Sequence, residues 1–207
     1  MGDPASKPLL IVLSAPSGGG KTTLCVGMLK ANKSIARAVT CTTRAPRGGE
    51  QDGVDYYFLE PQDFLKRVQA GNFLEHATVY GNSYGTLKSE VLSKLRAGRD
   101  VLLAVDVQGA ASITEAAEAD PELKPALITV FLTPASLEVL SARLKKRGED
   151  SAGDIKKRLN DARQEIARWK NFDYLIISTT IEEDERRMQA IFDAERMRQA
   201  RATPPEI

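Results

Sequence analysis

The chain has 207 residues, of which 42% are hydrophobic and 28% charged, a balance typical of a soluble globular protein with one sizeable core. The net charge of +1 and the scattered basic residues argue against a nucleic-acid partner. No apolar run approaches the length of about 18 residues that a membrane span requires, which argues against a membrane protein.

Apolar runs followed by helix patterns begin near the N-terminus. Residues 9–13 form a continuous apolar run, and residues 21 to about 32 follow with a helix pattern. Residues 100–107, DVLLAVDV, form a second apolar run, and a stretch rich in Ala and Glu follows it. Neither run alternates strictly between polar and apolar residues, which is typical of strands that are buried on both faces.

Two more such pairs follow in the C-terminal half. Residues 126–132 are apolar, and Thr133 and Pro134 after them predict the N-cap and first turn of a helix that ends at Gly148. Residues 174–178 are also apolar, and the stretch after them is acidic at its start and basic at its end, as a helix dipole favours. Strands separated by helices predict an α/β fold with a parallel sheet covered on both faces.

Two stretches interrupt this alternation. Residues 34–84 contain short strand-like pieces and turn signals, among them Asp52-Gly53 before VDYYF, and predict an inserted lobe with an antiparallel hairpin. Residues 147–170 are strongly charged, and the loop GEDSAG within them leads into a helix pattern. That composition is typical of a mobile, solvated flap.

The segment LIVLSAPSGGGKTTL, residues 10–24, places a glycine-rich turn between a strand and a helix. It matches the phosphate-binding pattern G-x-x-x-x-G-K-[ST] except that Ala15 takes the place of the first glycine. The amides of such a turn bind phosphate oxygens, its lysine reaches the outer phosphates, and the next hydroxyl is offered to Mg²⁺. We therefore expect a nucleotide-binding loop with Thr22 as the metal ligand. Its predicted binding residues are Ala15, Pro16, Ser17, Gly18, Gly19, Gly20, Lys21, Thr22 and Thr23.

The inserted stretch concentrates groups that suit a second phosphate. TCTTRAPRGGEQDGVDYYF contains Arg44, Arg47, Tyr56 and Tyr57 within a short span. Guanidinium groups bind a phosphate dianion through paired, charged hydrogen bonds, and tyrosine hydroxyls can add neutral donors. By itself this composition fits either a phosphate-binding site or a solvated loop with ordinary arginines.

Four segments together carry a resemblance to a known family. SAPSGGGKTTL, TTRAPRGGEQDGVDYYF, FLEHATVYGNSYGT and VDVQG occur in an order and at spacings similar to those of guanylate kinases, over residues 9–192. Members of that family often carry alanine at the Ala15 position. The resemblance implies a P-loop parallel sheet, an inserted nucleoside-monophosphate-binding lobe and a mobile lid. The implied boundaries are about 8–33, 90–142 and 171–200 for the core, 34–89 for the lobe and 143–170 for the lid.

The resemblance also implies an activity in purine nucleotide metabolism. The γ-phosphoryl group of ATP would be transferred to GMP, with Mg²⁺ as the cofactor and the two nucleotides as the small-molecule partners. The implied GMP site has a phosphate clamp, a glutamate that braces its arginines, and contacts to guanine. These residues are Arg44, Arg47, Tyr56 and Tyr84 for the clamp, Glu50 for the brace, and Thr40, Glu75, Thr86 and Asp106 for guanine.

Base chemistry singles out Glu75 among these contacts. Guanine presents two adjacent donors, N1–H and the 2-amino group, which one carboxylate can accept together. Adenine has an acceptor at N1 and no 2-amino group, so a carboxylate at this place selects guanine. We therefore interpret Glu75 as the guanine selector, with Asp106 reinforcing it.

The resemblance further implies which cations surround the transferring phosphoryl group. They are Lys21, Arg44 and three lid arginines, Arg143, Arg147 and Arg158, which oppose the charge on its equatorial oxygens. Arg143 and Arg147 are four residues apart and therefore lie on one helix face. No general base is expected, because the attacking phosphate oxygen of GMP is already ionised.

Two positions depart from the family pattern. Members usually have an acidic residue where this chain has Ala104, which leaves open how Mg²⁺ is held. They often have asparagine in the adenine site where this chain has Ser178, which leaves the strictness of ATP preference open.

Two other functions remain as alternatives. One is a catalytically inactive guanylate-kinase-like binding module, against which the intact Gly20, Lys21 and Thr22 argue. The other is a related P-loop kinase that acts on a sugar phosphate, for which a purine selector would have no use.

The two cysteines indicate the cellular compartment of the protein. Cys25 and Cys41 cannot form a disulfide framework and lack metal-ligand spacing, so we expect reduced thiols in a cytoplasmic protein. A homo-oligomer is neither indicated nor excluded by the sequence.

Overall fold

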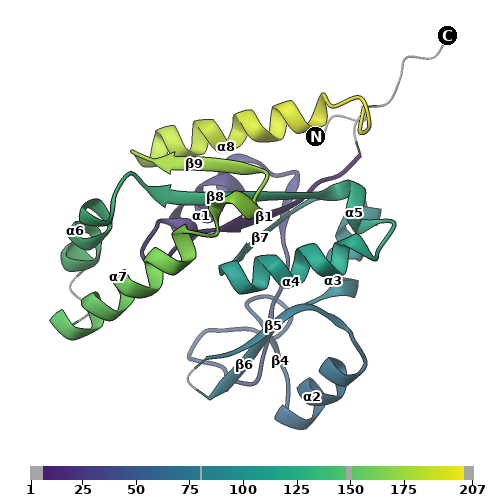
Figure 1. Ribbon diagram of the computed structural model, residues 1–207. Helices are drawn as coiled ribbons and strands as arrows, with labels where there is room; N and C mark the ends of the chain where they lie inside the picture. The colour runs from purple at the N-terminus through teal and green to yellow at the C-terminus, as the bar shows by residue number, and fades with distance from the viewer. Residues whose placement is uncertain (1–6, 80, 148–150, 203–207) are drawn as a thin grey trace.

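The computed structural model describes residues 7–79, 81–147 and 151–202. Its central sheet has five parallel strands in the order β2-β7-β1-β8-β9, and helices lie on both of its faces (Figure 1). The α/β fold with a covered parallel sheet is therefore confirmed. The strands are β1 Leu10–Ser14, β2 Ile35–Arg37, β7 Asp100–Val105, β8 Leu127–Pro134 and β9 Tyr174–Ser178.

Strand β1 lies in the middle of the core, and every one of its residues is buried. Ile11 and Leu13 pack into one apolar cluster with helices α1 (Lys21–Ala31) and α8 (Ile181–Arg196). Leu10 and Val12 point to the other face, where they pack with α3 (Lys88–Arg96) and α4 (Val107–Glu118). An apolar run without alternation is required here, because successive side chains point to opposite, equally buried faces.

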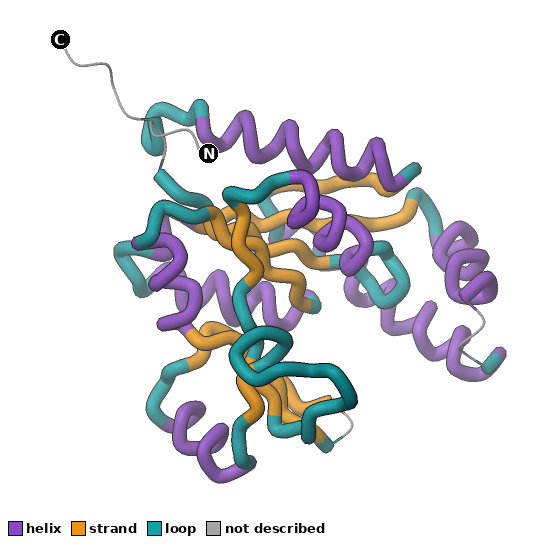
Figure 2. The backbone as a smooth tube through the Cα atoms, turned by 180° about the vertical axis from the view of Figure 1, so that it is seen from behind, coloured by secondary structure: helices purple, strands orange, loops and turns teal. Residues whose placement is uncertain are grey.

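The inserted lobe is a second sheet of four strands in the order β4-β3-β6-β5. Figure 2 shows it set apart from the central sheet, with helix α2 (Pro61–Gln69) at its far side. Its own small core contains Cys41, Phe64 and Leu87. Its strands are β3 Cys41–Thr42, β4 Tyr57–Phe58, β5 Phe73–Val79 and β6 Asn82–Leu87.

Two further helices, α6 (Leu137–Arg147) and α7 (Ala152–Ile166), form the region expected to be the lid. They pack on each other through an apolar cluster of their own that includes Leu140, Leu144 and Ala162. The remaining short helices are α5 Leu123–Ala126 and η1 Trp169–Asn171. None of the described helices is long and apolar enough to cross a membrane.

The predicted start of the helix after β8 is wrong. Thr133 and Pro134 are the last residues of β8, where they pair with Ile177 and Ser178 of β9, and α6 begins only at Leu137. The strand continues because pairing with β9 outweighs the local preference of Thr-Pro for a helix start. The predicted helix end at Gly148 lies outside the described residues.

The lobe contains the expected antiparallel hairpin, which is formed by β5 and β6. The turn at Asp52-Gly53 is not the turn of this hairpin, because it leads into β4, which pairs in parallel with β3. Asp52 closes its own loop instead, because its carboxylate accepts a hydrogen bond from the Phe58 amide at 2.9 Å. Residues of β2 belong to the central sheet through pairing with β7, so the lobe starts later than residue 34.

Candidate active site

The glycine-rich turn between β1 and α1 has the backbone that the phosphate-binding pattern requires. Gly18 and Gly20 have φ values of 82° and 100°, in the left-handed region that glycine favours. A Cβ atom on Gly18 would also lie 2.7 Å from Leu144 Cδ2 of α6. Ala15 is 3% exposed and packs in the core directly after β1, so its methyl group is accommodated there.

The Lys21 side chain extends from the start of α1 to the carboxyl end of β7 in the central sheet. Its Nζ donates a hydrogen bond to the carbonyl oxygen of Val105, at the end of β7, at 2.7 Å. Burial lowers the pKa of Lys21, and the neighbouring Asp106 carboxylate opposes that effect. The lysine therefore lies where the carboxyl ends of β1 and β7 meet, which is the usual place for ligands in open α/β sheets.

Two pockets surround this turn. The loop pocket has a volume of about 610 Å³, and the neighbouring base pocket, toward the start of α8, has about 360 Å³. The loop pocket is lined by Ala15, Pro16, Ser17, Gly18, Gly19, Gly20, Lys21, Thr22, Thr23, Asp106, Arg143, Leu144 and Glu165. The base pocket is lined by Gly18, Gly20, Thr23, Leu24, Arg143, Ser178, Thr179, Thr180, Ile181 and Asp184.

Arg143 lines both of these pockets. Its guanidinium donates hydrogen bonds to Ser178 Oγ at 3.1 Å and to the carbonyl oxygen of Thr179 at 3.4 Å. Ser178 Oγ in turn donates to the buried carboxylate of Asp184 at 2.6 Å. The side chain at position 178 is thus part of a hydrogen-bonded chain on the wall of the base pocket.

Helix α7 contacts the glycine-rich turn directly. Arg158 donates a hydrogen bond to Ser17 Oγ at 2.9 Å, and Glu165 Oε2 accepts one from the Ser17 amide at 3.2 Å. Burial raises the pKa of Glu165. Glu165 was not among the predicted site residues; the only sequence signal is that it follows Arg158 by two helical turns and so shares its face. The side chain of Arg147 lies outside what the structure describes.

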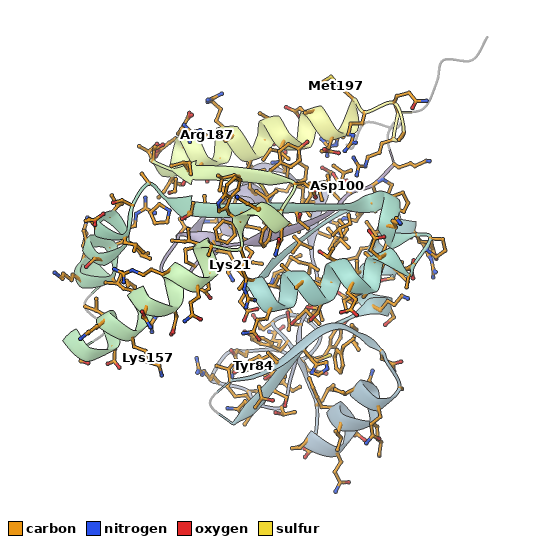
Figure 3. All side chains as sticks on the ribbon, viewed as in Figure 1. Lys21, Tyr84, Asp100, Lys157, Arg187 and Met197 are labelled. Carbon is orange, nitrogen blue, oxygen red and sulfur yellow. The ribbon has the colours of Figure 1, made fainter. Side chains whose placement is uncertain are left out.

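A third pocket, the lobe pocket, lies where the lobe meets the central sheet and has a volume of about 470 Å³. Figure 3 labels Lys21 in the core and Tyr84 in the lobe, on the two sides of this region. Thr22 and Asp106 line both the lobe pocket and the loop pocket, so the two pockets meet there. The other lining residues are Cys25, Val26, Leu29, Arg37, Ala38, Thr40, Tyr56, Glu75, Ala77, Val79, Tyr84, Thr86, Leu102, Leu103, Ala104 and Val105.

Strand pairing sets the position of Glu75. Glu75 on β5 is opposite Thr86 on β6, and Thr86 Oγ1 donates a hydrogen bond to Glu75 Oε1 at 2.6 Å. Burial raises the pKa of Glu75. Gly109 of α4 lies beside this carboxylate: a Cβ atom on Gly109 would be in ordinary van der Waals contact with Glu75 Oε2, at 3.5 Å.

Asp106 is held by the helix that follows it. Its Oδ1 caps the N-terminus of α4 by accepting hydrogen bonds from the amides of Gln108 at 3.0 Å and Gly109 at 2.8 Å. The side chain is exposed to the two pockets that meet at this point.

Three of the predicted GMP-site residues form a group of their own beside the lobe pocket. Arg44 Nη2 donates to both oxygens of Glu50, at 2.8 and 3.0 Å, and the amide of Arg47 donates to Glu50 Oε2 at 2.7 Å. The Arg44 guanidinium also lies 5.5 Å from the centre of the Tyr56 ring. These contacts connect the arginine loop to Tyr56, which lines the pocket.

The lobe pocket also contains a cation that no motif marks. Arg37, at the end of β2, lines the pocket on the side of Ala104. Strand register explains this placement, because Arg37 pairs with Leu102 and Ala104 is two residues further along the same strand.

Comparisons with known proteins show the family. The family model of guanylate kinase matches residues 7–195 of this chain. The guanylate kinase of Hahella chejuensis is 43% identical over 189 residues, 91% of this chain and 88% of that protein. The guanylate kinase of Coxiella burnetii is 43% identical over 192 residues, 93% of this chain and 90% of that protein. A crystal structure of guanylate kinase from Anaplasma phagocytophilum covers 95% of this chain and 90% of its own at a TM-score of 0.71 and 32% identity.

Proposed function

The chain belongs to the guanylate kinase family, and we propose that its pockets divide the ATP-dependent phosphorylation of GMP between a donor and an acceptor side. The observation that carries this division is that the loop pocket and the lobe pocket meet at Thr22 and Asp106. A phosphoryl group bound on the loop is thereby adjacent to an acceptor bound against the lobe.

The donor side is the glycine-rich turn and the base pocket. Backbone amides of the turn and the N-terminus of α1 suit the phosphates of ATP, with Lys21 on the outer phosphates. The base pocket shares Gly18, Gly20 and Arg143 with the loop pocket, so a nucleotide can extend from one into the other. We place the adenine there, against Ser178.

The acceptor side is the lobe pocket. We assign guanine recognition to Glu75, whose carboxylate accepts N1–H and the 2-amino group, with Thr40, Thr86 and Asp106 around the base. The GMP phosphate is assigned to the two arginines and two tyrosines of the clamp. Those residues are Arg44, Arg47, Tyr56 and Tyr84, with Glu50 holding the arginine loop.

Transfer needs positioning and charge neutralisation and no general base. The GMP phosphate oxygen attacks the γ-phosphorus, the bond to the β–γ bridging oxygen breaks, and ADP leaves. Lys21, Arg143 and Arg158 come from the loop, α6 and α7, and Arg143 and Lys21 line the loop pocket where the charge develops. We assign Arg147 to the same group by sequence.

The residues present fit Mg²⁺ bound together with ATP. The Thr22 hydroxyl and the Asp106 carboxylate are oxygen donors at the junction of the two pockets, and the described residues hold no cluster of three His, Cys, Asp or Glu that would make a separate metal site. When bound, the ion would neutralise phosphate charge. Reduced Cys25 and Cys41 are consistent with the proposed cytoplasmic location.

Neither alternative function is favoured by the site. An inactive module has no need for the left-handed glycine backbone at Gly18 and Gly20, and a sugar phosphate has no need for the Glu75–Thr86 pair. The decisive experiment is a coupled ADP-release assay with GMP, dGMP, AMP and ribose phosphates side by side. We expect GMP to be the preferred acceptor, and a faster reaction with a ribose phosphate or equal rates with AMP would contradict the proposal.

Replacing Ala104 by Asp tests the metal side of the proposal. Ala104 is exposed to the lobe pocket two residues before Asp106, so a carboxylate there would add an oxygen ligand near the metal. We expect a lower Mg²⁺ concentration at half-maximal rate, together with tighter Mg²⁺–ATP binding in calorimetry. An unchanged or higher Mg²⁺ requirement in a normally folded variant would mean that position 104 does not face the metal. Ala104→Asn is the matched variant without the charge.

A further inference from the structure

The lobe is connected to the central sheet at two places that lie close together. Residues 38–40 join β2 of the central sheet to β3 of the lobe, and β6 of the lobe runs directly into α3 at Leu87 and Lys88. Glu90 is in the first turn of α3, and the residue is only 9% exposed. A buried glutamate at such a junction requires partners.

The Glu90 carboxylate has partners on three different segments. Oε1 accepts hydrogen bonds from the Val39 amide at 2.9 Å and from Lys94 Nζ at 2.6 Å, and Oε2 accepts one from the Tyr57 hydroxyl at 3.3 Å. Burial alone would raise the pKa of Glu90, but Lys94 and the Val39 amide outweigh it and hold the pKa below its usual range. The group is therefore ionised at neutral pH.

These bonds hold Thr40 from two sides. Val39, whose amide is bonded to Glu90, directly precedes Thr40 in the connection. Tyr57, whose hydroxyl is bonded to Glu90, donates its own amide to the carbonyl oxygen of Thr40 at 3.0 Å. Thr40 lines the lobe pocket, so the position of the pocket wall depends on a carboxylate that does not itself line the pocket.

We propose that Glu90 is a positioning residue that fixes the lobe against the central sheet and thereby sets the affinity for the acceptor nucleotide. The inference rests on the proposed function for the identity of that nucleotide. The hydrogen-bond partners of the Glu90 carboxylate described above are all away from the glycine-rich turn, so the donor side should be unaffected. Loss of the Glu90 carboxylate should therefore raise KM for GMP and leave KM for ATP nearly unchanged.

The test compares Glu90→Ala, Glu90→Gln and Lys94→Met in full steady-state kinetics with GMP and ATP each varied. Glu90→Ala leaves the Val39 amide without its acceptor, and we expect KM for GMP to rise about tenfold or more while KM for ATP stays within about twofold. Glu90→Gln keeps an oxygen that can accept the hydrogen bond from the Val39 amide, so its KM for GMP should stay much closer to the wild-type value. Lys94→Met removes the ion pair but not the hydrogen bond to Val39, so its KM for GMP should change by less than about threefold.

Hydrogen exchange adds a readout that does not depend on activity. The Val39 amide should be protected in the wild type and in Glu90→Gln, and should exchange faster in Glu90→Ala. An unchanged KM for GMP in Glu90→Ala, or equal rises in both KM values, would overturn the proposal. If Glu90→Ala does not fold, Glu90→Met, which fills the same space but also leaves the Val39 amide without an acceptor, is judged by the same two criteria. A wild type inactive on GMP would refute the proposed function instead, and the exchange of Val39 would still test the role of Glu90.

Discussion

Replacing Glu75 by Gln is expected to lower kcat/KM for GMP by several orders of magnitude while ATP binding is retained. The wild-type residue is half-buried, accepts a hydrogen bond from Thr86 and lines a pocket together with Asp106. Gln keeps the size of Glu but turns one acceptor into a donor, which would face the N–H groups of guanine. A site built for such donors discriminates against a base that lacks them by roughly 10⁴-fold or more.

The acceptor series gives the sharpest form of this test. In the wild type the order of kcat/KM should be GMP, then IMP, then AMP, because IMP keeps N1–H but lacks the 2-amino group. The order should flatten in Glu75→Gln. Glu60→Gln, at an exposed position of the same lobe, is the matched control and should keep the wild-type order. Similar wild-type rates for GMP and AMP would refute the guanylate assignment itself.

Glu75→Gln should raise the stability of the protein at neutral pH although it lowers the activity. Burial raises the pKa of Glu75 in the folded protein above its unfolded value, so the folded state holds the proton more tightly. The free energy of unfolding therefore falls as pH rises from the unfolded pKa through the folded pKa. Gln does not titrate, so Glu75→Gln should lack this fall and should have a higher Tm than the wild type at neutral pH. A lower Tm at neutral pH would contradict the assigned desolvation cost.

Replacing Lys21 by Ala is expected to lower kcat by about 10²-fold or more while GMP still binds. Lys21 is part of the glycine-rich turn and lines the loop pocket, but it does not line the lobe pocket. Its ammonium lies at the carboxyl end of β7, beside the place where we put the outer phosphates. Removing it should therefore raise the barrier to phosphoryl transfer with little effect on the acceptor.

Calorimetry of GMP binding separates the two sides. GMP affinity in Lys21→Ala should stay within about threefold of the wild type, because the acceptor contacts are on the lobe. Lys30→Ala, in the exposed last turn of the same helix, is the control for removing a positive charge and should leave kcat unchanged. A collapse of GMP affinity in Lys21→Ala would show that the division between loop and lobe is wrong.

Sequence alone determined the features whose physics is local. The glycine-rich turn needs left-handed backbone at Gly18 and Gly20, and that requirement is visible as glycine in the pattern. The buried runs of the central sheet are equally readable, because a strand that is covered on both faces must be apolar throughout. The family follows from the same local motifs taken in order.

The tertiary structure decided the features that depend on contacts between residues far apart in the sequence. Thr133 and Pro134 favour a helix start locally, yet pairing with β9 keeps them in a strand. Glu165 reaches Ser17, Arg37 reaches the lobe pocket, and Glu90 holds Val39, in each case through the packing of elements far apart in sequence. The sequence does not show which residues meet in such contacts, because the order of the strands in the sheet brings them together and their separation along the chain does not.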